Sequence, residues 1–343
     1  MFQLPPLSSS PAARAGQCYL PVYWSQYGQV PTEQTAFLLY PDGSVTSLQP
    51  VTNFPGGGQF WIPGATYDRM AGRWLPVGPE AVAPDGVTFA YADYDLPPSP
   101  AAGMSTGGGP HAAGALATTG RVHLVDARTG ADRILFGGSP TYEVIGYTAD
   151  GIYLQQVGLT MDGPFASGLF LLKPSGGVPA PVAGGNRTLD RAGWDVIGGA
   201  AWGVDYSTGG GLQPGNQLVR LDLTTGAIQV WLTAPEGTGV TRVGTDSKGS
   251  PLVLTYSSGY SSTGSPPPSP PTQLLKVSAP GSGTVIFTAA DPTAPQPSGP
   301  SYVDANGAWL SGGLGAIWLD VADALKSFAV AGAQRVGVGG TCA

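Results

Sequence analysis

One short string in the chain has the form that positions a nucleophilic serine. Gly103-Met-Ser105-Thr-Gly107 matches the nucleophile elbow of serine hydrolases, and His111 follows shortly after it. The elbow requires a strand before the serine and a helix after it, whereas this string lies in a loop rich in proline and glycine. Because the chain contains 54 glycines, chance accounts for the match. We therefore assign no catalytic residue.

The sequence offers few ligands for a metal ion or a cofactor. Its two histidines are His111 and His123, and its two cysteines are Cys18 and Cys342. A zinc site built on several histidines is excluded, and no Asp-x-Asp-x-Asp-Gly spacing that would hold calcium occurs. We expect neither a metal nor a cofactor. Two suitably spaced acids would suffice for a hydrolase or lyase acting on polysaccharide or peptide, so that alternative stays open.

Tyrosines and aspartates gather where several loops begin. Tyrosine provides a large amphipathic surface at low entropic cost, which suits a rim that binds a protein or a glycan. The aspartates among them are expected to be solvated loop carboxylates. The predicted ligand-binding residues are Tyr27, Asp93, Tyr94, Asp95, Tyr206, Tyr256 and Tyr260.

Two repeated phrases indicate the elements that must position these residues. An aspartate and a glycine precede an apolar run in Asp85-Gly86-Val-Thr-Phe and in Asp150-Gly151-Ile-Tyr-Leu. A strand, a turn ending in glycine and another strand follow each other in Val125-Asp126-Ala-Arg-Thr-Gly130 and in Leu221-Asp222-Leu-Thr-Thr-Gly226. Two glycine hairpins in each period of about 40 to 60 residues predict stacked four-stranded units, the blades of an all-β propeller.

We name the strands of each blade A to D, from the inner to the outer strand. The expected A-to-B turns lie near Gly57, Gly86, Gly151, Gly199, Gly249, Gly307 and Gly340. The expected C-to-D turns lie near Gly43, Gly72, Gly130, Gly176, Gly226, Gly283 and Asp323. These alternating turns predict seven blades, with six as the alternative. Val321 to Ala331 would also suit a helix, but its place in the repeat predicts an outer hairpin.

The two chain ends are predicted to share one blade. The segment that begins at Gln334 resembles the inner strand at Thr241, so it would be the inner strand of the blade whose other strands begin at Cys18. That placement brings Cys18 and Cys342 together, and we predict a disulfide that closes the ring. Chain entropy for so long a loop gives roughly 5 to 6 kcal/mol as an upper figure.

A family resemblance agrees with this architecture. The segment Ala81-Val-Ala-Pro-Asp85-Gly86-Val-Thr-Phe-Ala-Tyr91 resembles the Pro-Asp-Gly unit of WD40-like, TolB-type bacterial propeller repeats. The segment Tyr67-Asp68-Arg-Met-Ala-Gly-Arg-Trp74 is similar to the kelch signature and appears once. The resemblance implies a propeller fold and brings no catalytic residue with it.

Composition and charge exclude some classes of binding partner. Charged residues make up 11% of the 343 residues, and the net charge is -7. The 15 lysines and arginines are scattered singly, which argues against a nucleic-acid partner. No apolar stretch approaches the length of a membrane helix, so we expect no membrane insertion. Residues 1–17 read as a flexible tail or linker and residues 18–343 as the propeller domain.

The favoured interpretation is a monomeric, non-catalytic propeller that binds a protein or glycan through its B-to-C loop face. The predicted disulfide indicates an oxidising, extracytoplasmic compartment, with the signal or anchor outside this sequence. Two alternatives stay open, namely the carboxylate-dependent hydrolase or lyase at the channel mouth and a structural spacer module of a surface protein.

Overall fold

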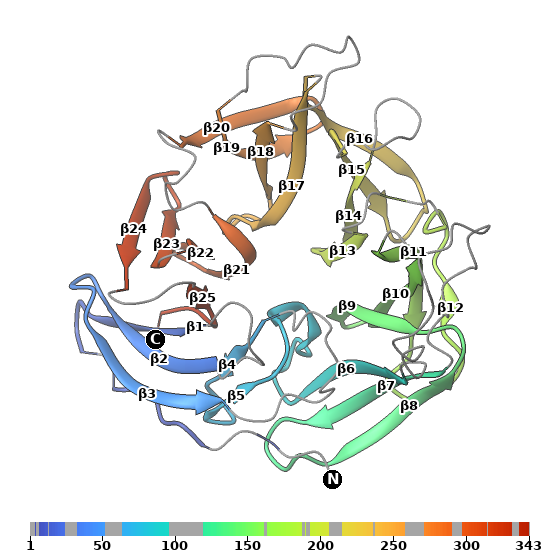
Figure 1. Cartoon of the computed structure of the whole chain (residues 1–343), viewed down its shortest axis with the longest axis horizontal. Coiled ribbons are helices and arrows are strands. Elements are labelled where there is room, and N and C mark those ends of the chain that lie inside the picture. Colours follow the sequence, from blue (N-terminus) through green and yellow to red (C-terminus); the bar gives the residue numbers. More distant parts are fainter. Residues whose placement is uncertain are drawn as a thin grey trace, which may run out of the picture.

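The protein is built almost entirely of β-strands, as the repeats predict. The computed structural model describes residues 4, 7–12, 14–24, 33–51, 64–95, 119–160, 163–186, 189, 193–205, 215–235, 237–257, 271–289, 297–313, 315–330 and 336–342. Within them, five sheets have four strands, one has three and one has two. The sheets are arranged around a common axis, each with one edge strand toward the centre (Figure 1). This is the arrangement of a β-propeller.

The strand order of each sheet follows the chain from the inner edge outward, with one exception. In the four-stranded sheet that holds both ends of the chain, the order is β25 (Val336–Val338), β1 (Cys18–Trp24), β2 (Glu33–Tyr40) and β3 (Val45–Val51). The two smaller sheets contain β4 (Thr66–Asp68) with β5 (Arg73–Leu75), and β6 (Thr88–Asp95), β7 (Thr119–Asp126) and β8 (Asp132–Gly138).

The remaining four sheets have four strands each. One contains β9 (Tyr142–Thr148), β10 (Gly151–Thr160), β11 (Gly163–Leu172) and β12 (Ala180–Pro181). The next contains β13 (Trp194–Ile197), β14 (Ala200–Asp205), β15 (Gln217–Asp222) and β16 (Ile228–Thr233). It is followed by β17 (Thr238–Thr245), β18 (Pro251–Ser257), β19 (Gln273–Ala279) and β20 (Ser282–Thr288). The last contains β21 (Ser298–Asp304), β22 (Gly307–Ser311), β23 (Gly315–Asp320) and β24 (Leu325–Ala329).

Turns in which an aspartate side chain accepts backbone N–H groups, known as Asx-turns, join strands at one side of the ring. The Asp126 Oδ1 atom accepts the backbone N–H groups of Arg128 and Thr129, at 3.0 and 2.7 Å, and Gly130 takes a φ of +72°. Asp222 accepts two N–H groups in the same way two sheets further along the chain. The turns expected from the repeated phrases are thus confirmed here, and the aspartates act as turn formers.

The hydrophobic core lies between neighbouring sheets. Trp309, 1% exposed, is in one cluster with Leu20 and Leu38 of the sheet that holds both chain ends. Tyr40 meets the Trp309 ring edge-on, with the ring centroids 5.6 Å apart. Each sheet is therefore stabilised by apolar contacts on both of its faces, which is why successive residues of strands such as β14 and β22 are all buried.

The expected outer hairpin near the end of the chain is confirmed, because β24 pairs with β23 where the sequence would also suit a helix. The unit that contains β6 differs from the repeat. Its inner segment begins as a short 3₁₀ helix, η1 (Pro79–Ala81). The residues after η1 contact β6 through a bridge between Val82 and Phe89 and through the Ala83 N–H, which donates to the Thr88 carbonyl at 2.8 Å. Pro79 and Pro84 lack the N–H groups that a longer inner strand would use, which explains the difference.

The two chain ends meet in one sheet. Strand β25 pairs antiparallel with β1, with Val22 opposite Val338. Cys18 and Cys342 form a disulfide with their Cα atoms 5.1 Å apart, so the predicted pairing of the two cysteines is confirmed. In the segment that precedes β1, Leu7 forms a bridge with Arg73, and the Ser8 N–H donates to the Gly72 carbonyl at 2.7 Å.

Candidate functional site: charged residues on the inner strands

Three successive inner strands carry one charged residue each in an otherwise apolar setting. The local sequences are Tyr142-Glu143-Val-Ile on β9, Trp194-Asp195-Val-Ile on β13 and Thr241-Arg242-Val-Gly on β17. The charged residue is half-buried, and the valine after it is buried between sheets. Because side chains alternate along a strand, the charge faces away from that valine. The repeat thus places ionisable groups close to the axis.

Asp195 and Arg242 form an ion pair across two adjacent sheets. Their registers agree, since Asp195 lies opposite Trp202 and Arg242 opposite Val253, in each case the third residue of the following strand. The Arg242 Nη2 atom contacts the Asp195 Oδ2 atom. Burial lowers the pKa of Arg242, while the negative charge of Glu80 opposes that effect. Arg242 therefore needs Asp195 as its partner, because an isolated guanidinium in this setting would be costly.

Glu143 is held by a buried amide. The Gln155 Nε2 atom donates to Glu143 Oε2 at 3.1 Å, and Gln155 Oε1 accepts the backbone N–H of Trp194 at 3.0 Å. Gly193 leaves room for this amide, since a Cβ atom there would overlap Gln155. Burial raises the pKa of Glu143, and the hydrogen bond from Gln155 partly offsets the rise. Gln155 thereby fixes the Glu143 carboxyl between two sheets.

Glu80 completes the group from the 3₁₀ helix η1. Its side chain folds back over Gly78, where a Cβ atom would overlap the carboxyl group. Burial raises the pKa of Glu80 to about 7, the charge of Arg242 lowers it, and the charge of Glu143 raises it. Glu80 is half-buried by surface area, so the desolvation comes from the protein atoms around it while some solvent contact remains. A carboxyl group with such a pKa can hold or release a proton near neutral pH.

Tyr302 lies on β21, the inner strand of the sheet that follows β17–β20 around the ring (Figure 1). Its hydroxyl donates to the Ala65 carbonyl at 3.1 Å and lies 3.0 Å from Thr66 Oγ1. Burial raises the pKa of Tyr302 well above its usual value, and the charge of Glu80 contributes in the same direction. Tyr302 also lines an open depression of about 420 Å³ together with Arg69, Pro79 and Ser301. The depression is shallow and is bounded by three different sheets.

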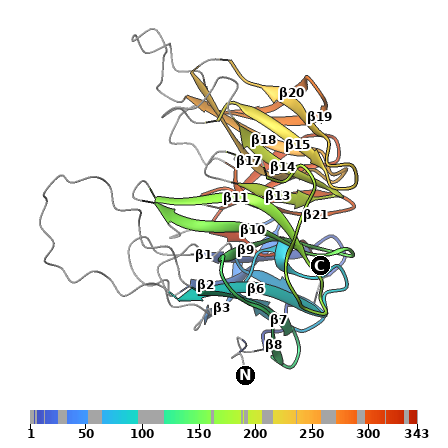
Figure 2. The same ribbon diagram turned by 90° about the vertical axis from the view of Figure 1, so that its right-hand side faces the viewer.

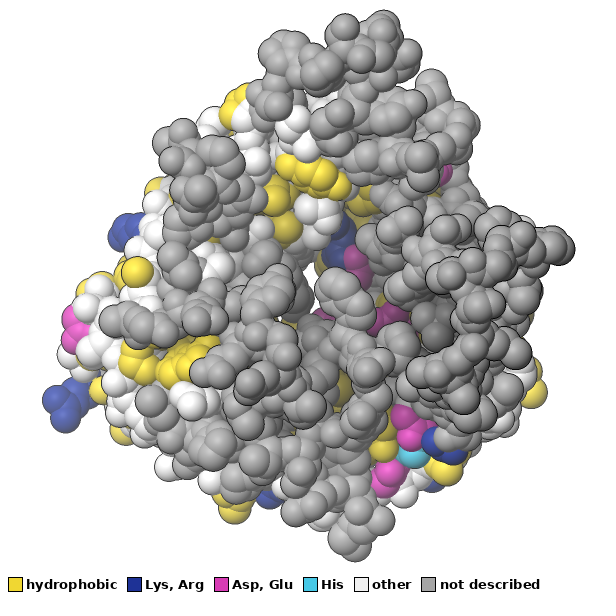
Figure 3. Space-filling model, viewed as in Figure 1, with side chains coloured by type: hydrophobic (Ala, Val, Ile, Leu, Met, Phe, Trp, Pro, Cys, Tyr) yellow, Lys and Arg dark blue, Asp and Glu magenta, His cyan; other side chains and the backbone are white. Residues whose placement is uncertain are grey.

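We call Glu80, Glu143, Asp195 and Arg242 the axial cluster. Figure 3 shows acidic and basic side chains next to the opening at the centre of the face in view. The cluster has three carboxyl groups and a single guanidinium, so it can bind a polar ligand, and a protonated Glu80 could act as a general acid. Among the described residues, no group of three or more histidine, cysteine or acidic side chains could hold a metal ion.

Only some of the sequence-predicted binding residues fall within the described part of the chain. Tyr27, Tyr206 and Tyr260 lie outside the described residues. Tyr94 and Asp95 are the last two residues of β6. Tyr256 lies near the end of β18, half-buried and opposite Gly239, where a Cβ atom would overlap its ring. The role of all these residues in binding stays a prediction.

Asp93 differs from the solvated loop carboxylate that we expected. It belongs to β6, and Arg121 Nε of β7 donates to its Oδ1 atom at 2.8 Å. His123, whose side chain is 8% exposed, lies between Asp93 and Asp132, with Nδ1 at 2.9 Å from Asp132 Oδ1. Tyr91 stacks on the imidazole with the ring centroids 4.5 Å apart. These residues form a charged network across three strands, although the buried His123 Nε2 atom has no hydrogen-bond partner among the described residues and lies 3.6 Å from Asp93 Oδ1.

The sequence contained a signal for the axial cluster. Glu143, Asp195 and Arg242 each precede a valine in the inner strand of a unit, and a charge inside an apolar inner strand is rare enough to mark a site. Glu80 carries no comparable signal, because η1 replaces the inner strand in its unit.

No protein-family model matches the chain, and no curated protein matches it either. Within the described residues, no helix is both long and apolar enough to cross a bilayer.

Among solved structures, the chain is similar to TolB from Acinetobacter baumannii, with 12% identity and a TM-score of 0.46 over 93% of this chain and 65% of that one. It is also similar to the tricorn protease, with 11% identity and a TM-score of 0.44 over 91% of this chain and 26% of that one. A third similar structure is an acylaminoacyl peptidase, with 10% identity and a TM-score of 0.42 over 95% of this chain and 46% of that one. The chain spans about two thirds of the TolB chain and less than half of each peptidase chain.

Proposed function

We propose that the protein is an extracytoplasmic propeller that binds a protein or a glycan through its B-to-C loop face, without catalysis. The observation that carries this proposal is the contrast between the two sides of the ring. The B-to-C connections span residues 25–32, 96–118, 206–216 and 258–272. The turns on the other side span residues 149–150, 198–199, 127–131 and 223–227. Long connections on one side of a rigid scaffold are where recognition usually lies.

The longest hairpin supports the same side. Strands β10 and β11 both have ten residues, and their pairing continues to Thr160 opposite Gly163. This hairpin extends beyond the neighbouring strands on one side of the ring (Figure 2). A projecting hairpin adds edge surface and backbone groups to the loop face. A protein or a glycan partner could use both.

The proposed architecture is a ring of seven blades that is closed by the two chain ends. The seven sheets, the pairing of β1 with β25 and the Cys18–Cys342 disulfide support it. The sheet of β4 and β5 is the smallest of the seven, and Leu7 adds a bridge to its edge. The disulfide also supports an oxidising compartment, because such bonds rarely persist in a reducing cytosol. We also propose that the protein is a monomer. The strands at its two ends, β1 and β25, pair with each other and so leave neither strand for a second copy to pair with.

Binding fits the charge pattern better than catalysis does. Asp195 is paired with Arg242, Glu143 is bound by Gln155, and His123 is enclosed by two aspartates and a tyrosine. Charged groups that are engaged by neighbouring side chains in this way stabilise the fold and lend little to a reacting substrate. The axial cluster would then set the polarity at the centre of the face to which the ligand binds.

The test is a binding comparison between two matched sets of substitutions. Tyr94→Ala, Tyr206→Ala and Tyr260→Ala together alter the loop face, while Arg128→Ala with Lys248→Ala alters exposed turns on the other side. Immobilised proteins are exposed to a glycan array and to a mixture of secreted proteins. We expect the loop variant to lose at least about tenfold of the captured signal, equal to about 1.4 kcal/mol, and the turn variant to retain it. Equal capture by both variants would discard the loop face.

A second function is favoured by one specific observation, the raised pKa of Glu80 next to Glu143. Glycosidases use a pair of carboxyl groups, one of which donates a proton and therefore has a raised pKa. We propose as the alternative that these two groups hydrolyse or eliminate across a bond of a polysaccharide or peptide at the channel mouth. A panel of such polymers would be assayed for new reducing ends, unsaturated ends or free amines. Activity that disappears in Glu80→Gln but survives in the turn variant would establish this alternative over binding alone.

A further inference from the structure

An arginine from the neighbouring sheet bridges the two ends of the chain. Arg69 lies in the turn between β4 and β5, directly after Asp68. The Asp68 Oδ1 atom accepts the N–H groups of Met70 and Ala71, at 2.8 and 3.1 Å, which fixes the turn. Because the turn is fixed on both sides of Arg69, its exposed side chain leaves the backbone in a defined direction.

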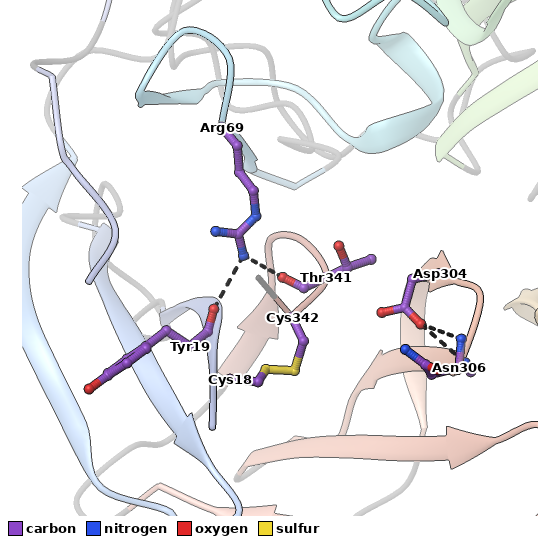
Figure 4. Close-up of a disulfide and its surroundings, with 8 residues drawn as sticks. Cys18, Tyr19, Arg69, Asp304, Asn306, Thr341 and Cys342 are labelled. Atoms are coloured by element: carbon purple, nitrogen blue, oxygen red, sulfur yellow. Dashed lines mark hydrogen bonds between the residues drawn. A yellow bond between two sulfur atoms is a disulfide. The ribbon is translucent and has the colours of Figure 1, made fainter. Parts of the chain in front are cut away.

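The place it reaches is the pair of residues next to the disulfide. The Arg69 Nη2 atom donates to the Tyr19 carbonyl at 3.2 Å and to the Thr341 carbonyl at 2.6 Å. Tyr19 follows Cys18, and Thr341 precedes Cys342. Figure 4 shows the guanidinium above the two half-cystines, with both hydrogen bonds. We call these two contacts the Arg69 bridge.

The Arg69 bridge differs from the disulfide in its chemistry and in its origin. A hydrogen bond from a guanidinium to a carbonyl is charge-assisted and is unaffected by thiol reductants. Arg69 also comes from a third segment of the chain, so it ties both ends to the neighbouring sheet. A backbone bond from the Tyr67 N–H to the Gly339 carbonyl, at 2.6 Å, joins the same two sheets.

We propose that the Arg69 bridge keeps the chain ends joined when the Cys18–Cys342 disulfide is reduced. The two connections are then redundant, and either one is enough to hold β25 against β1. This inference rests on the proposed closure of the ring by its two ends. It makes the closed protein tolerant of a reducing episode, for example before export or during exposure to a thiol reductant.

The test measures hydrogen exchange of the Gly339 amide, directly after β25, with and without tris(2-carboxyethyl)phosphine. This amide donates to the Pro21 carbonyl of β1 at 2.9 Å, so its exchange reports the contact between the two chain ends. Wild type, Arg69→Met and Arg133→Met are compared. Arg133 is the matched control, because its Nη2 atom donates to the Pro174 carbonyl at 2.7 Å, between two other sheets. We expect reduction to accelerate exchange by less than about threefold in wild type and in Arg133→Met, and by more than about tenfold in Arg69→Met.

Two outcomes would overturn the redundancy. One is an equal acceleration on reduction in wild type and in Arg69→Met, and the other is a full acceleration in oxidised Arg69→Met. Should Arg69→Met fail to fold, Arg69→Lys retains the charge but not the fork of donors, and an intermediate acceleration is expected. Fast exchange of the Gly339 amide in oxidised wild type would instead contradict ring closure itself, and none of these outcomes depends on ligand binding.

Discussion

Replacing Glu80 by glutamine should stabilise the protein at alkaline pH. In the unfolded chain the carboxyl has a pKa of 4.5, and burial raises the pKa of Glu80 to about 7 in the folded protein. Between these values the folded state binds more protons than the unfolded state, so the free energy of unfolding falls as pH rises. The difference corresponds to about 3 kcal/mol as an upper figure. Partial solvent contact at Glu80 reduces the expected effect to about 1–2 kcal/mol.

The assay is urea unfolding at pH 5, 6, 7 and 8, followed by the fluorescence of the eight tryptophans. Glu80→Gln should be more stable than wild type at pH 8 by that amount, with a smaller difference at pH 5. Glu143 contributes a slope of the same sign in both proteins, since burial raises its pKa too. Asp195→Asn is the control with the opposite sign, because it removes the partner of Arg242. The reasoning is refuted if Glu80→Gln changes stability equally at pH 5 and pH 8, or lowers it at pH 8.

Two further substitutions test the packing of the sheets. Gly315→Ala should destabilise the protein by about 1–3 kcal/mol, because the added Cβ would overlap the Phe328 carbonyl. Gly137→Ala is the control and should change stability little, since the atoms nearest to its added Cβ would be 4.0 Å away. Thermal unfolding of both variants checks this, and equal melting temperatures would contradict it. Tyr302→Phe should cost about 1–2 kcal/mol through loss of its bond to a backbone carbonyl near β4. Tyr142→Phe is the control, as burial alone raises the pKa of Tyr142, and similar losses in both variants would refute the assignment.

Much of the fold could be predicted because turn chemistry is local. Asp126 and Asp222 mark turns through bonds to their own backbone, so the repeat is readable without knowledge of the distant contacts. The disulfide could be predicted because the segment at Gln334 repeats the one at Thr241. The η1 segment could not, because two prolines act on one inner strand only, and a repeat-based argument assumes that all units are alike.

The candidate site was harder to foresee for a geometric reason. Glu143, Asp195 and Arg242 are separated by about 50 residues along the chain, and only the ring brings them toward one axis. Their partners, such as Gln155, lie on yet other strands. Asp93 was placed in a loop because its neighbours Tyr94 and Asp95 are polar, but pairing with β7 continues to Asp95 and brings Arg121 within reach. Composition near a strand end could not reveal that the strand continues.

The equivalent positions of Asp195 and Arg242 have an evolutionary consequence. Each of these side chains leaves the inner edge of its own sheet, and the backbone pairing beneath it involves neither the carboxylate nor the guanidinium. A substitution at one such position therefore changes the polarity of one sector of the channel without altering the strands that hold it. Descendants of this chain could acquire new ligands by exchanging these side chains sector by sector, provided that each new charge finds a counterpart in the adjacent sector.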